Sequence, residues 1–323
     1  MKRRNFKLLI MSGSPDSLNA NASLRYYVGS GFRQAFPDAI IAVSSYEDSL
    51  RTARELKPDM VLVFGSIMLD GADFGLIAEE ARHQGAVLGF WLHDDPYEFD
   101  MNARIYDLAD IVFTNDRASL DFYPPSLPVH HLPLAGCAAT HLRPVASRGG
   151  PDMFFCGHRF DNRGRFFGAL APYAKAMGAE MSVVGTGWEH AGIEGAVAMT
   201  VPNAVLPDLY ATALGVVNIG RDQNLANRRF AIRPSTPGPR TFEAAFAGAA
   251  QIMVAEGLEI LDYFEPETEI LLADDAESFA AQWERLLRDR DYSLTLGRNA
   301  QRRALAEHGY DARARRIVEL AFR

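Results

Sequence analysis

The sequence has few cysteines, no long hydrophobic run and no excess of positive charge. Cys137 and Cys156 are the only cysteines among 323 residues, so we expect neither a disulfide framework nor a cysteine-based zinc site. Two free thiols are typical of a reducing compartment, and we expect a cytoplasmic protein. The longest apolar run, Gly85–Leu92, is much shorter than the ~20 residues that a transmembrane helix requires. The sequence therefore predicts no membrane span, and no secretory signal is recognised.

Acidic side chains outnumber basic ones. The 41 Asp and Glu residues and 33 Lys and Arg residues give a net charge of −8. Nucleic-acid binding depends on a strong positive field, so we expect no nucleic-acid partner. The arginines near the C-terminal end alternate with acidic residues, which favours a salt-bridged helix surface over a lipid-binding one.

What the chain does have is 48% hydrophobic residues, enough for the cores of two α/β domains. Short apolar runs alternate with amphipathic segments, which is the pattern of parallel sheets with crossover helices. The predicted strands are 6–11, 39–43, 60–64, 86–92, 111–114 and 129–132, then 153–156, 180–184, 197–200, 215–219, 251–254 and 269–272. The predicted helices lie near 22–35, 47–56, 72–84, 101–108 and 116–122, then 163–177, 203–213, 239–248, 257–263, 276–288, 291–307 and 311–322.

Residues 135–151 interrupt this pattern with small residues, Gly and Pro. They predict a linker between an N-terminal domain, 1–140, and a C-terminal domain, 151–310. Each domain is expected to be a Rossmann-like α/β/α sandwich. Ligands bind outside the carboxyl ends of the strands in such sheets, so two facing domains predict a cleft for two substrates.

The segment 237–248 predicts a site for a diphosphate. Pro239 suits the first position of a helix, whose start offers free N–H groups beside a positive dipole end. The backbone around Thr241 and Phe242, with the charge of Arg240, could then bind the phosphates. Glu243 falls one turn further and could accept hydrogen bonds from two ribose hydroxyls. Alternatively, Glu243 only complements the helix dipole and Arg240 is solvated.

Two strand ends in the second half add candidates for the same site. Gly157 ends a strand and would let the backbone approach a ligand, and Arg163 near the next helix start could bind a phosphate. Gly185 and Gly187 follow another strand. They form either an ordinary turn or a wall for the nucleotide base.

The first half offers a candidate catalytic group at the end of a buried strand. Pro96 follows His93, Asp94 and Asp95. Two adjacent carboxylates at the end of a buried strand destabilise the fold unless they form ion pairs, cap a turn or take part in catalysis. Asp94 is our choice for the base that takes the proton of an acceptor hydroxyl. The alternatives are a turn cap at Asp95, a structural cation and a structural histidine; we expect no metal ligand set.

Two loops complete the candidates. Ser12 and Ser14 follow the first strand and either contact the acceptor or form a simple turn. Asn218, Arg228 and Arg229 belong to an aperiodic stretch suited to sugar hydroxyls or phosphates, or to a solvated loop.

The residues Arg240–Ala249 resemble the donor-binding helix of glycosyltransferases with the GT-B fold, and more narrowly those of the CgeB-like family, which is related to a spore-maturation protein. Other pieces agree in order, and the resemblance covers roughly residues 86–316. They are Trp91–Pro96, Phe155–Gly157 with Asn162 and Arg163, Val184–Trp188, Val217–Ile219, Tyr263–Pro266 with Glu269 and Ile270, and His308–Tyr310 with Arg313.

The resemblance implies transfer of a sugar from a nucleotide-diphosphate sugar to an unknown hydroxyl acceptor, without a metal or other cofactor. It also implies that Glu243 binds the donor ribose and that a final helix, 311–323, returns to the first domain. Many retaining relatives carry a second Glu eight positions earlier, where this chain has Ser235. Two alternatives therefore stay open: a nucleotide-sugar epimerase or hydrolase on the same fold, and a non-catalytic binding protein.

Overall fold

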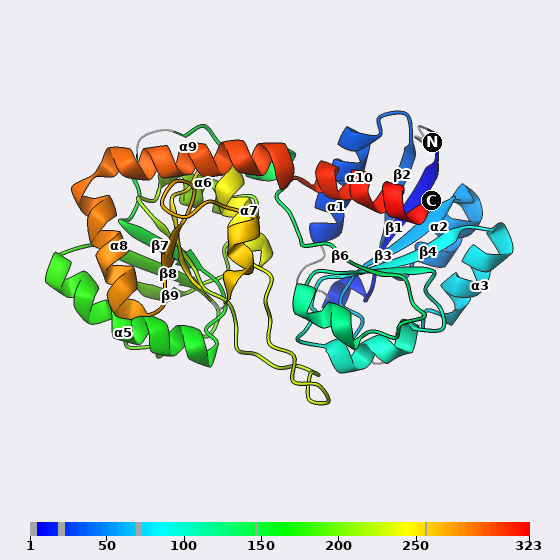
Figure 1. Ribbon diagram of the computed structural model, residues 1–323, viewed down its shortest axis with the longest axis horizontal. Helices are drawn as coiled ribbons and strands as arrows, with labels where there is room; N and C mark the ends of the chain where they lie inside the picture. The colour runs from blue at the N-terminus through cyan, green and yellow to red at the C-terminus, as the bar shows by residue number, and fades with distance from the viewer. Residues whose placement is uncertain (1–4, 19–22, 69–72, 146–147, 256) are drawn as a thin grey trace. The chain divides into compact units, whose positions relative to one another are not determined.

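The computed structural model describes residues 5–18, 23–68, 73–145, 148–255 and 257–323, and these form two compact units (Figure 1). Unit 1 contains the residues up to Leu134 together with Asn224–Thr236 and Tyr310–Arg323. Unit 2 contains Ala135–Gln223 and Pro237–Gly309. The chain therefore passes from one unit to the other four times.

Unit 1 is built on a six-stranded parallel sheet with the order β2-β1-β3-β4-β5-β6. Its strands are β1 (Lys7–Ser12), β2 (Ile40–Ser44), β3 (Met60–Gly65), β4 (Val87–Leu92), β5 (Ile111–Thr114) and β6 (Val129–His131). Its α-helices are α1 (Leu24–Ala35), α2 (Ser49–Leu56), α3 (Gly75–Gln84) and α10 (Tyr310–Ala321). The 3-10 helices are η1 (Asp16–Leu18), η2 (Phe99–Ile105) and η3 (Arg117–Phe122).

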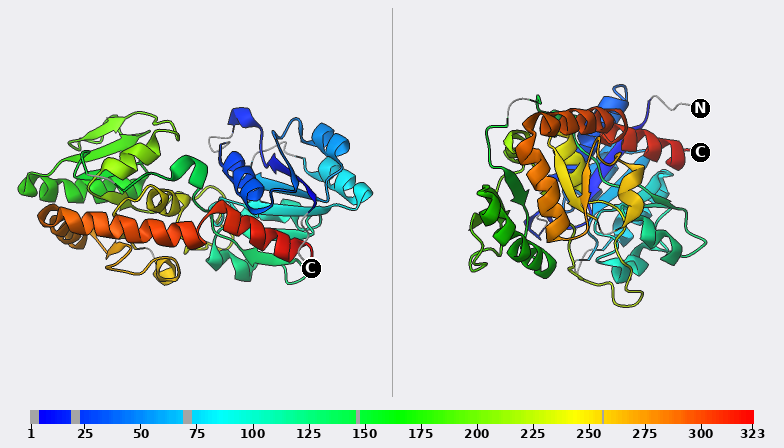
Figure 2. Two further views of the ribbon diagram at one scale, coloured as in Figure 1. Left: turned by 90° about the horizontal axis from the view of Figure 1, so that it is seen from above. Right: turned by 60° about the vertical axis from the view of Figure 1, so that its left-hand side comes forward.

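The final helix belongs to the core of unit 1. In Figures 1 and 2 the red α10 lies beside the blue α1. A β-carbon on Gly31 would stand 2.4 Å from the carbonyl carbon of Tyr310, so only glycine lets the two helices approach this closely. The ring of Tyr310 also packs edge-on against Trp91 of β4. Burial of these apolar surfaces ties α10 to the sheet.

Unit 2 has a second six-stranded parallel sheet, with the order β12-β11-β10-β7-β8-β9. Its strands are β7 (Met153–Cys156), β8 (Met181–Gly185), β9 (Ala196–Ala198), β10 (Val216–Asn218), β11 (Gln251–Val254) and β12 (Leu271–Ala273). Its helices are α4 (Ala138–His141), α5 (Asp161–Met177), α6 (Leu206–Thr212), α7 (Pro239–Phe246), η4 (Leu258–Asp262), α8 (Ala276–Arg288) and α9 (Arg290–Glu307).

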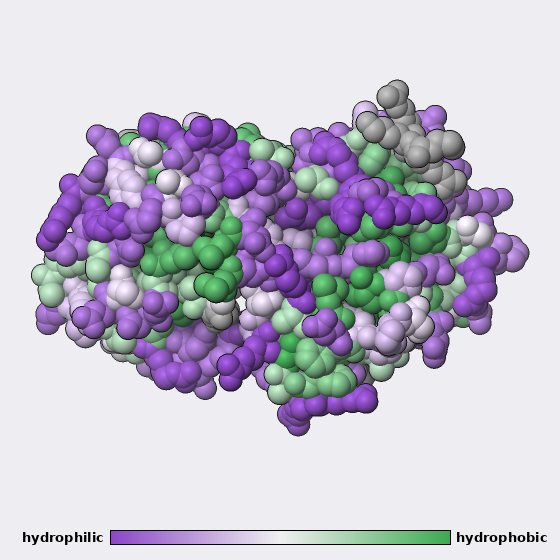
Figure 3. Space-filling view, in the orientation of Figure 1, coloured by the Kyte–Doolittle hydropathy of each residue, from purple (hydrophilic) through white to green (hydrophobic). Residues whose placement is uncertain are grey.

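Alternate residues of β7 face opposite layers of unit 2. Met153 and Phe155 pack with apolar residues of α5 and α8, whereas Phe154 and Cys156 pack with residues of α6 and α7. Because successive strand residues point to opposite faces, an all-apolar strand is buried on both sides. Hydrophilic side chains cover much of the face drawn in Figure 3, with apolar atoms gathered in places on each unit.

The twelve predicted strands are confirmed, with ends that differ by one or two residues at most sites. Three predicted helices, near 101–108, 116–122 and 257–263, are 3-10 helices instead. The starts of the predicted helices 22–35 and 72–84 include residues outside the described ones. The predicted linker is partly structured: it contains α4, and the buried guanidinium of Arg148 donates to carbonyl oxygens of Ala211, Gly248 and Ser293.

Residues 224–236, which the sequence predicts within the C-terminal domain, belong to unit 1. Ile232 is buried in the core of unit 1. The carboxylate of Asp116 accepts the backbone N–H groups of Ser235 and Thr236 at 2.7 and 3.0 Å. An aperiodic sequence carries no signal for such contacts, because they depend on partners more than a hundred positions away.

Candidate active site

The strand order of unit 2 reverses beside β7, which has β8 and β9 on one side and β10 to β12 on the other. Ligands of open parallel sheets bind beyond the carboxyl ends of the strands at such a point. Here these ends are Cys156 of β7 and Asn218 of β10. The predicted donor residues Gly157 and Arg163 directly follow β7, so the topology brings them to this point.

Arg163 connects the two strand ends. Its guanidinium donates to the carbonyl oxygens of His158, Ile219 and Gly220 at 3.0, 3.1 and 2.9 Å. The side chain is buried, and these bonds to backbone oxygens fix both loops in place. We therefore assign Arg163 a positioning role, in place of the predicted phosphate clamp.

Gly157 lies against two guanidinium groups. A β-carbon at this residue would stand 3.1 Å from an Nη1 atom of Arg163 and 3.1 Å from that of Arg240. Nε of Arg240 donates to the hydroxyl of Tyr210 at 3.0 Å, which orients the half-buried side chain. The missing side chain at Gly157 thus lets two positive charges approach the end of β7, an arrangement that suits an anion.

Glu243 lies on α7, three residues after Arg240. Its side chain is 13% exposed, and its carboxylate lies 3.8 Å from Nε2 of His141, a contact that is an ion pair only when the imidazole is protonated. Burial raises the pKa of Glu243 to about 7, although the charge of Arg240 opposes this. A mostly buried carboxylate that accepts no hydrogen bond from the described part of the chain is costly. Two hydroxyl donors from a ligand would satisfy it.

His141 does not neutralise Glu243. Its Nδ1 accepts the backbone N–H of Cys137 at 2.9 Å, so the proton of the neutral ring sits on Nε2, the atom that faces Glu243. Burial lowers the pKa of His141 to about 4, and the charge of Arg143 adds to this. The imidazole is therefore neutral at pH 7.

The side chains of Asn218, Thr241 and Phe242 hold the start of α7 in place. Nδ2 of Asn218 donates to Oγ1 of Thr241 at 2.5 Å and to Oε1 of Gln251 at 3.2 Å. Thr241 is fully buried, and the ring of Phe242 packs edge-on against Tyr263 in the core. The side chains of Thr241 and Phe242 therefore face the sheet and the core, and the prediction for these two residues concerns their backbone, which stays a prediction. Asn218, a possible substrate residue in the sequence, ends β10, and its amide bonds to Thr241 and Gln251.

Gly185 and Gly187 form the turn after β8, with φ values of +143° and +83°. A β-carbon on Gly185 would stand 2.0 Å from the carbonyl oxygen of Gly157. Glycine is therefore needed to seat this turn against the end of β7. Of the two interpretations from the sequence, the close packing supports the structural turn.

In unit 1, Ser12 and Ser14 lie at the end of β1. Both are buried, and Oγ of Ser12 accepts the backbone N–H of Ser14 at 3.4 Å. The N–H of Gly13 between them donates to the carbonyl oxygen of Phe64 at 3.0 Å. The segment is a turn packed on β3, which supports the simple turn of the two interpretations from the sequence.

His93 and Asp94 form a pair at the end of β4. Nε2 of His93 lies 3.0 Å from Oδ2 of Asp94, whose side chain is 14% exposed. The imidazole packs edge-on against Phe64, with ring centroids 5.5 Å apart. A partly exposed carboxylate beside an imidazole can accept a proton from a bound hydroxyl.

Glu98 joins this pair and is absent from the sequence-based candidates. Its buried carboxylate accepts Oγ of Ser66 at 2.6 Å and the N–H of Ile67 at 2.9 Å. Burial raises the pKa of Glu98, and the charge of Asp94 adds to this. The residue follows Asp94 within one loop, so the spacing alone could have suggested it.

Asp95 has a structural role. Its buried carboxylate accepts Nδ2 of Asn102 at 2.8 Å, Oγ1 of Thr114 at 2.6 Å and the hydroxyl of Tyr123 at 2.5 Å. Burial raises its pKa. Because these three donors occupy the carboxylate, Asp95 fastens η2, β5 and the residue after η3 together, which corrects its predicted catalytic role.

Arg228 and Arg229 belong to the loop 224–236 of unit 1. Asp100 accepts their backbone N–H groups at 2.7 and 3.2 Å, and both side chains are exposed. The structure groups this loop with unit 1, whereas the sequence predicts it within the C-terminal domain. Tyr210, which holds Arg240, had no local signal, because its helix position looks like any other apolar core position.

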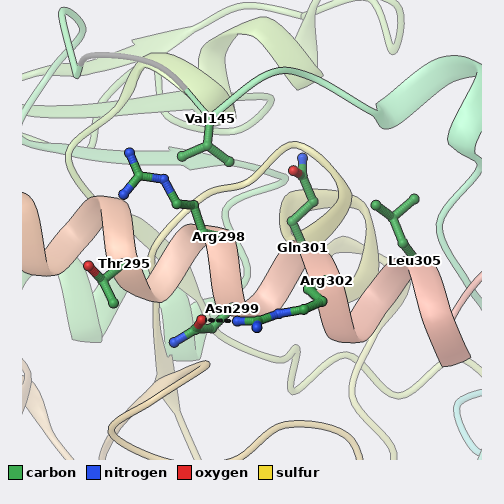
Figure 4. Close-up of a pocket in the computed structure, with 7 residues that line it drawn as sticks. All are labelled: Val145, Thr295, Arg298, Asn299, Gln301, Arg302 and Leu305. Atoms are coloured by element: carbon green, nitrogen blue, oxygen red, sulfur yellow. Dashed lines mark hydrogen bonds between the residues drawn. The ribbon is translucent and has the colours of Figure 1, made fainter.

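A separate hollow of unit 2 runs along α9, with a cavity volume of about 580 Å³. It is lined by Val145, Thr295, Arg298, Asn299, Gln301, Arg302 and Leu305, and Figure 4 shows Arg302 bonded to Asn299. None of the predicted donor residues lines it.

The described part of the chain contains no group of three or more His, Cys, Asp or Glu residues that could hold a metal ion. Among its helices none is long and apolar enough to cross a membrane.

Comparison with known proteins gives one family match and several structural likenesses. Residues 163–319 match the family described as "Glycosyl transferase-like". HepE from Anabaena in complex with UDP and glucose has a TM-score of 0.64 at 13% identity, over 97% of this chain and 98% of that chain. Sucrose-phosphate synthase from Thermosynechococcus elongatus has a TM-score of 0.63 at 14% identity, over 97% and 98%.

The lipopolysaccharide outer core galactosyltransferase WaaB has a TM-score of 0.58 at 11% identity, over 98% of this chain and 99% of that chain. No curated protein matches the sequence. At these identities the likenesses establish the fold, which is GT-B, as the resemblance predicts. The family match adds a similarity to glycosyl transferase-like proteins over residues 163–319, slightly less than half of the chain.

Proposed function

We propose that this chain, a glycosyl transferase-like protein of the GT-B fold, moves a sugar from a nucleoside-diphosphate sugar to a hydroxyl acceptor without a metal ion. The observation that carries the proposal is the Glu243 carboxylate, mostly buried and without a hydrogen bond from the described residues, beside Arg240. The vicinal hydroxyls of a ribose supply the two donors that such a group lacks. HepE is in complex with UDP and glucose, so UDP-glucose is the first donor to test.

The departing diphosphate binds where Gly157 approaches the guanidinium of Arg240. As the bond between the sugar C1 and the phosphate oxygen breaks, negative charge develops on the diphosphate. The positive end of α7 and Arg240 stabilise this charge. Arg163 contributes by fixing the loops after β7 and β10.

On the acceptor side, Asp94 is the base. It takes the hydroxyl proton while the acceptor oxygen forms the new bond to C1. His93 lies 3.0 Å from its carboxylate, and Glu98 is close enough for the charge of Asp94 to raise the pKa of Glu98. We further propose membership of the CgeB-like family, on the ordered motifs from Trp91 to Tyr310, and a cytoplasmic location, on the free thiols.

The first test is calorimetric titration of the full-length protein with UDP-, GDP-, ADP- and dTDP-glucose, with and without magnesium. Selective binding of one donor, lost in Glu243→Ala and independent of magnesium, supports the proposal. Absence of binding by all donors contradicts it.

Product analysis with the bound donor then separates the enzyme classes. A glycoside formed from an added acceptor supports transfer. Free sugar or an epimer as the sole product, with or without acceptor, assigns the chain to the hydrolase or epimerase class. Binding without turnover assigns it to non-catalytic binding proteins.

A further inference from the structure

The loop 224–236 and the 3-10 helices η2 and η3 enclose a pocket in unit 1, here called the aromatic pocket. Its cavity volume is about 300 Å³. The rings that line it are Phe99, Tyr106, Phe122, Tyr123 and Phe230, and Arg229 lies among them. Ligand pockets span roughly 300–1,000 Å³, so this one has room for a single small ring.

The walls of the aromatic pocket are held in place by hydrogen bonds beneath them. Asp100 binds the backbone N–H groups of Arg228 and Arg229. The side chain of Asn227 closes the loop by bonding both the N–H and the carbonyl oxygen of Ile232, at 3.0 and 2.8 Å. A pocket whose walls are fixed beforehand pays little ordering entropy when a ligand enters.

Two of the rings present a surface to solvent. Phe122 and Phe230 are each 38% exposed, and their ring centroids lie 5.2 Å apart. Phe99 packs edge-on beneath both, at 6.2 and 5.8 Å. In Figure 3 apolar atoms gather on the lower part of unit 1, where Figure 1 draws the 3-10 helices. Exposed aromatic faces of this kind mark binding sites.

The aromatic pocket also holds two polar groups that make no hydrogen bond with the described residues. The guanidinium of Arg229 lies 4.9 Å from the centroid of Phe230, and it makes no hydrogen bond or ion pair with the described residues. The half-buried hydroxyl of Tyr106 makes no hydrogen bond with them either. Both groups are available to a ligand that lies against the rings.

We propose that the aromatic pocket binds one sugar ring of a glycan or glycoconjugate acceptor. The inference rests on the proposed glycosyl transfer and names the acceptor class. The C–H face of a pyranose packs against Phe122 and Phe230, while its hydroxyls take the donors of Arg229 and the hydroxyl of Tyr106. An acyl chain would leave both polar groups without partners.

The aromatic pocket is distinct from the reacting position but built on the same segment. None of its lining residues is His93 or Asp94. Its wall residue Tyr123 donates to Asp95, which directly follows Asp94 in the chain. The carboxylate of Asp95 therefore links the catalytic loop to a subsite that holds a more remote unit of the acceptor.

The test is a microarray of neutral and acidic oligosaccharides, probed with the full-length protein in the absence of donor. We expect the wild type to bind a subset of glycans, and Phe230→Ala and Arg229→Gln to bind the same glycans at least about tenfold more weakly. Tyr106→Phe should weaken binding less. Tyr173→Ala, at a tyrosine of α5 that is also 38% exposed, is the matched control and should bind normally.

The proposal is overturned if the wild type binds no glycan, or if Phe230→Ala and Arg229→Gln bind as well as the control. It is also overturned if a fluorescent fatty acid or a proline-rich peptide, and no glycan, depends on Phe230. UDP-glucose titration of the same variants keeps this result separate from the proposed function. If the wild type binds the donor but no glycan, only the proposal for the aromatic pocket is contradicted. If the wild type does not bind the donor, the proposed transferase function is contradicted.

Discussion

Replacing Glu243 with glutamine is expected to weaken donor binding and to stabilise the fold at the same time. In the free protein the pKa of Glu243 is raised to about 7 by burial. Only the ionised carboxylate accepts hydrogen bonds from both ribose hydroxyls, so the donor binds the ionised form. Donor affinity should therefore rise with pH up to about pH 7 and then level off.

The size of this effect follows from the ionised fraction. One pH unit below the pKa, about a tenth of the carboxylate is ionised, so the apparent Kd at pH 6 should be about tenfold that at pH 8. A carboxylate with the ordinary pKa would show almost no change over this range. His141 does not contribute, because its pKa of about 4 leaves it neutral throughout.

Stability should respond in the opposite direction. The folded pKa of Glu243 lies above the value of 4.5 for a free side chain, so its stabilising contribution is present below pH 4.5 and is lost as pH rises through 7. At pH 8 the ionised form costs the fold up to about 3 kcal/mol, at about 1.4 kcal/mol for each pKa unit. Glu243→Gln removes this cost and should raise Tm by several degrees at pH 8 but not near pH 4.

The assay pairs calorimetric titration at pH 6, 7 and 8 with thermal unfolding at pH 4 and 8. The ligand is a nucleoside-diphosphate sugar, whose phosphates do not titrate in this range. Glu194→Gln, at an exposed glutamate of unit 2, is the matched control and should change neither quantity. Donor affinity that is independent of pH, or equal in Glu243→Gln and the wild type, would refute the reasoning.

Four further predictions concern residues of the two sites. Asp94→Asn should lower kcat by about 10²- to 10⁴-fold with Tm unchanged, and full activity would remove Asp94 as the base. Asp95→Asn should lower unfolding stability by about 1–3 kcal/mol, since an amide replaces one acceptor oxygen with a donor; a Tm equal to the wild type would contradict its structural role. Arg163→Met removes the hydrogen-bond donors of three carbonyl oxygens and should lower Tm and donor affinity together. A loss of affinity without a loss of stability would instead support direct phosphate binding by Arg163. Gly185→Ala should destabilise unit 2, because the new β-carbon meets the oxygen of Gly157 at 2.0 Å; unfolding at the wild-type temperature would contradict this.

The fold could be predicted from the sequence because its signals are local. Each buried strand is a short apolar run, and Phe242 and Phe246 follow the helical spacing that turns them to the core. The 3-10 helices were predicted as α-helices because their apolar residues show similar spacing over so few positions. The loop 224–236 could not be placed, since Asp100 and Asp116 hold it from far away in the sequence.

The candidate site was only partly predictable for a related reason. The sequence identifies which polar residues end strands or begin helices, and this was enough for Gly157, Arg240 and Glu243 to be brought together. The sequence does not indicate where a side chain points or which protein groups already take up its hydrogen bonds. Arg163, Asp95 and Asn218 have the chemistry of ligand-binding residues, yet backbone carbonyls and neighbouring side chains take up their hydrogen bonds.

The four passages of the chain between the units restrict how the protein can be divided or recombined. A single cut after Leu134 separates unit 1 from Asn224–Thr236 and from its final helix. The fragment would then expose the apolar surfaces that Ile232 and Tyr310 cover in the intact protein. Exchange of unit 1 with that of a relative therefore requires three gene segments to move together, and exchange of unit 2 requires two. The segment Asn224–Thr236 of unit 1 is encoded between the two segments of unit 2, so the two units are expected to evolve together.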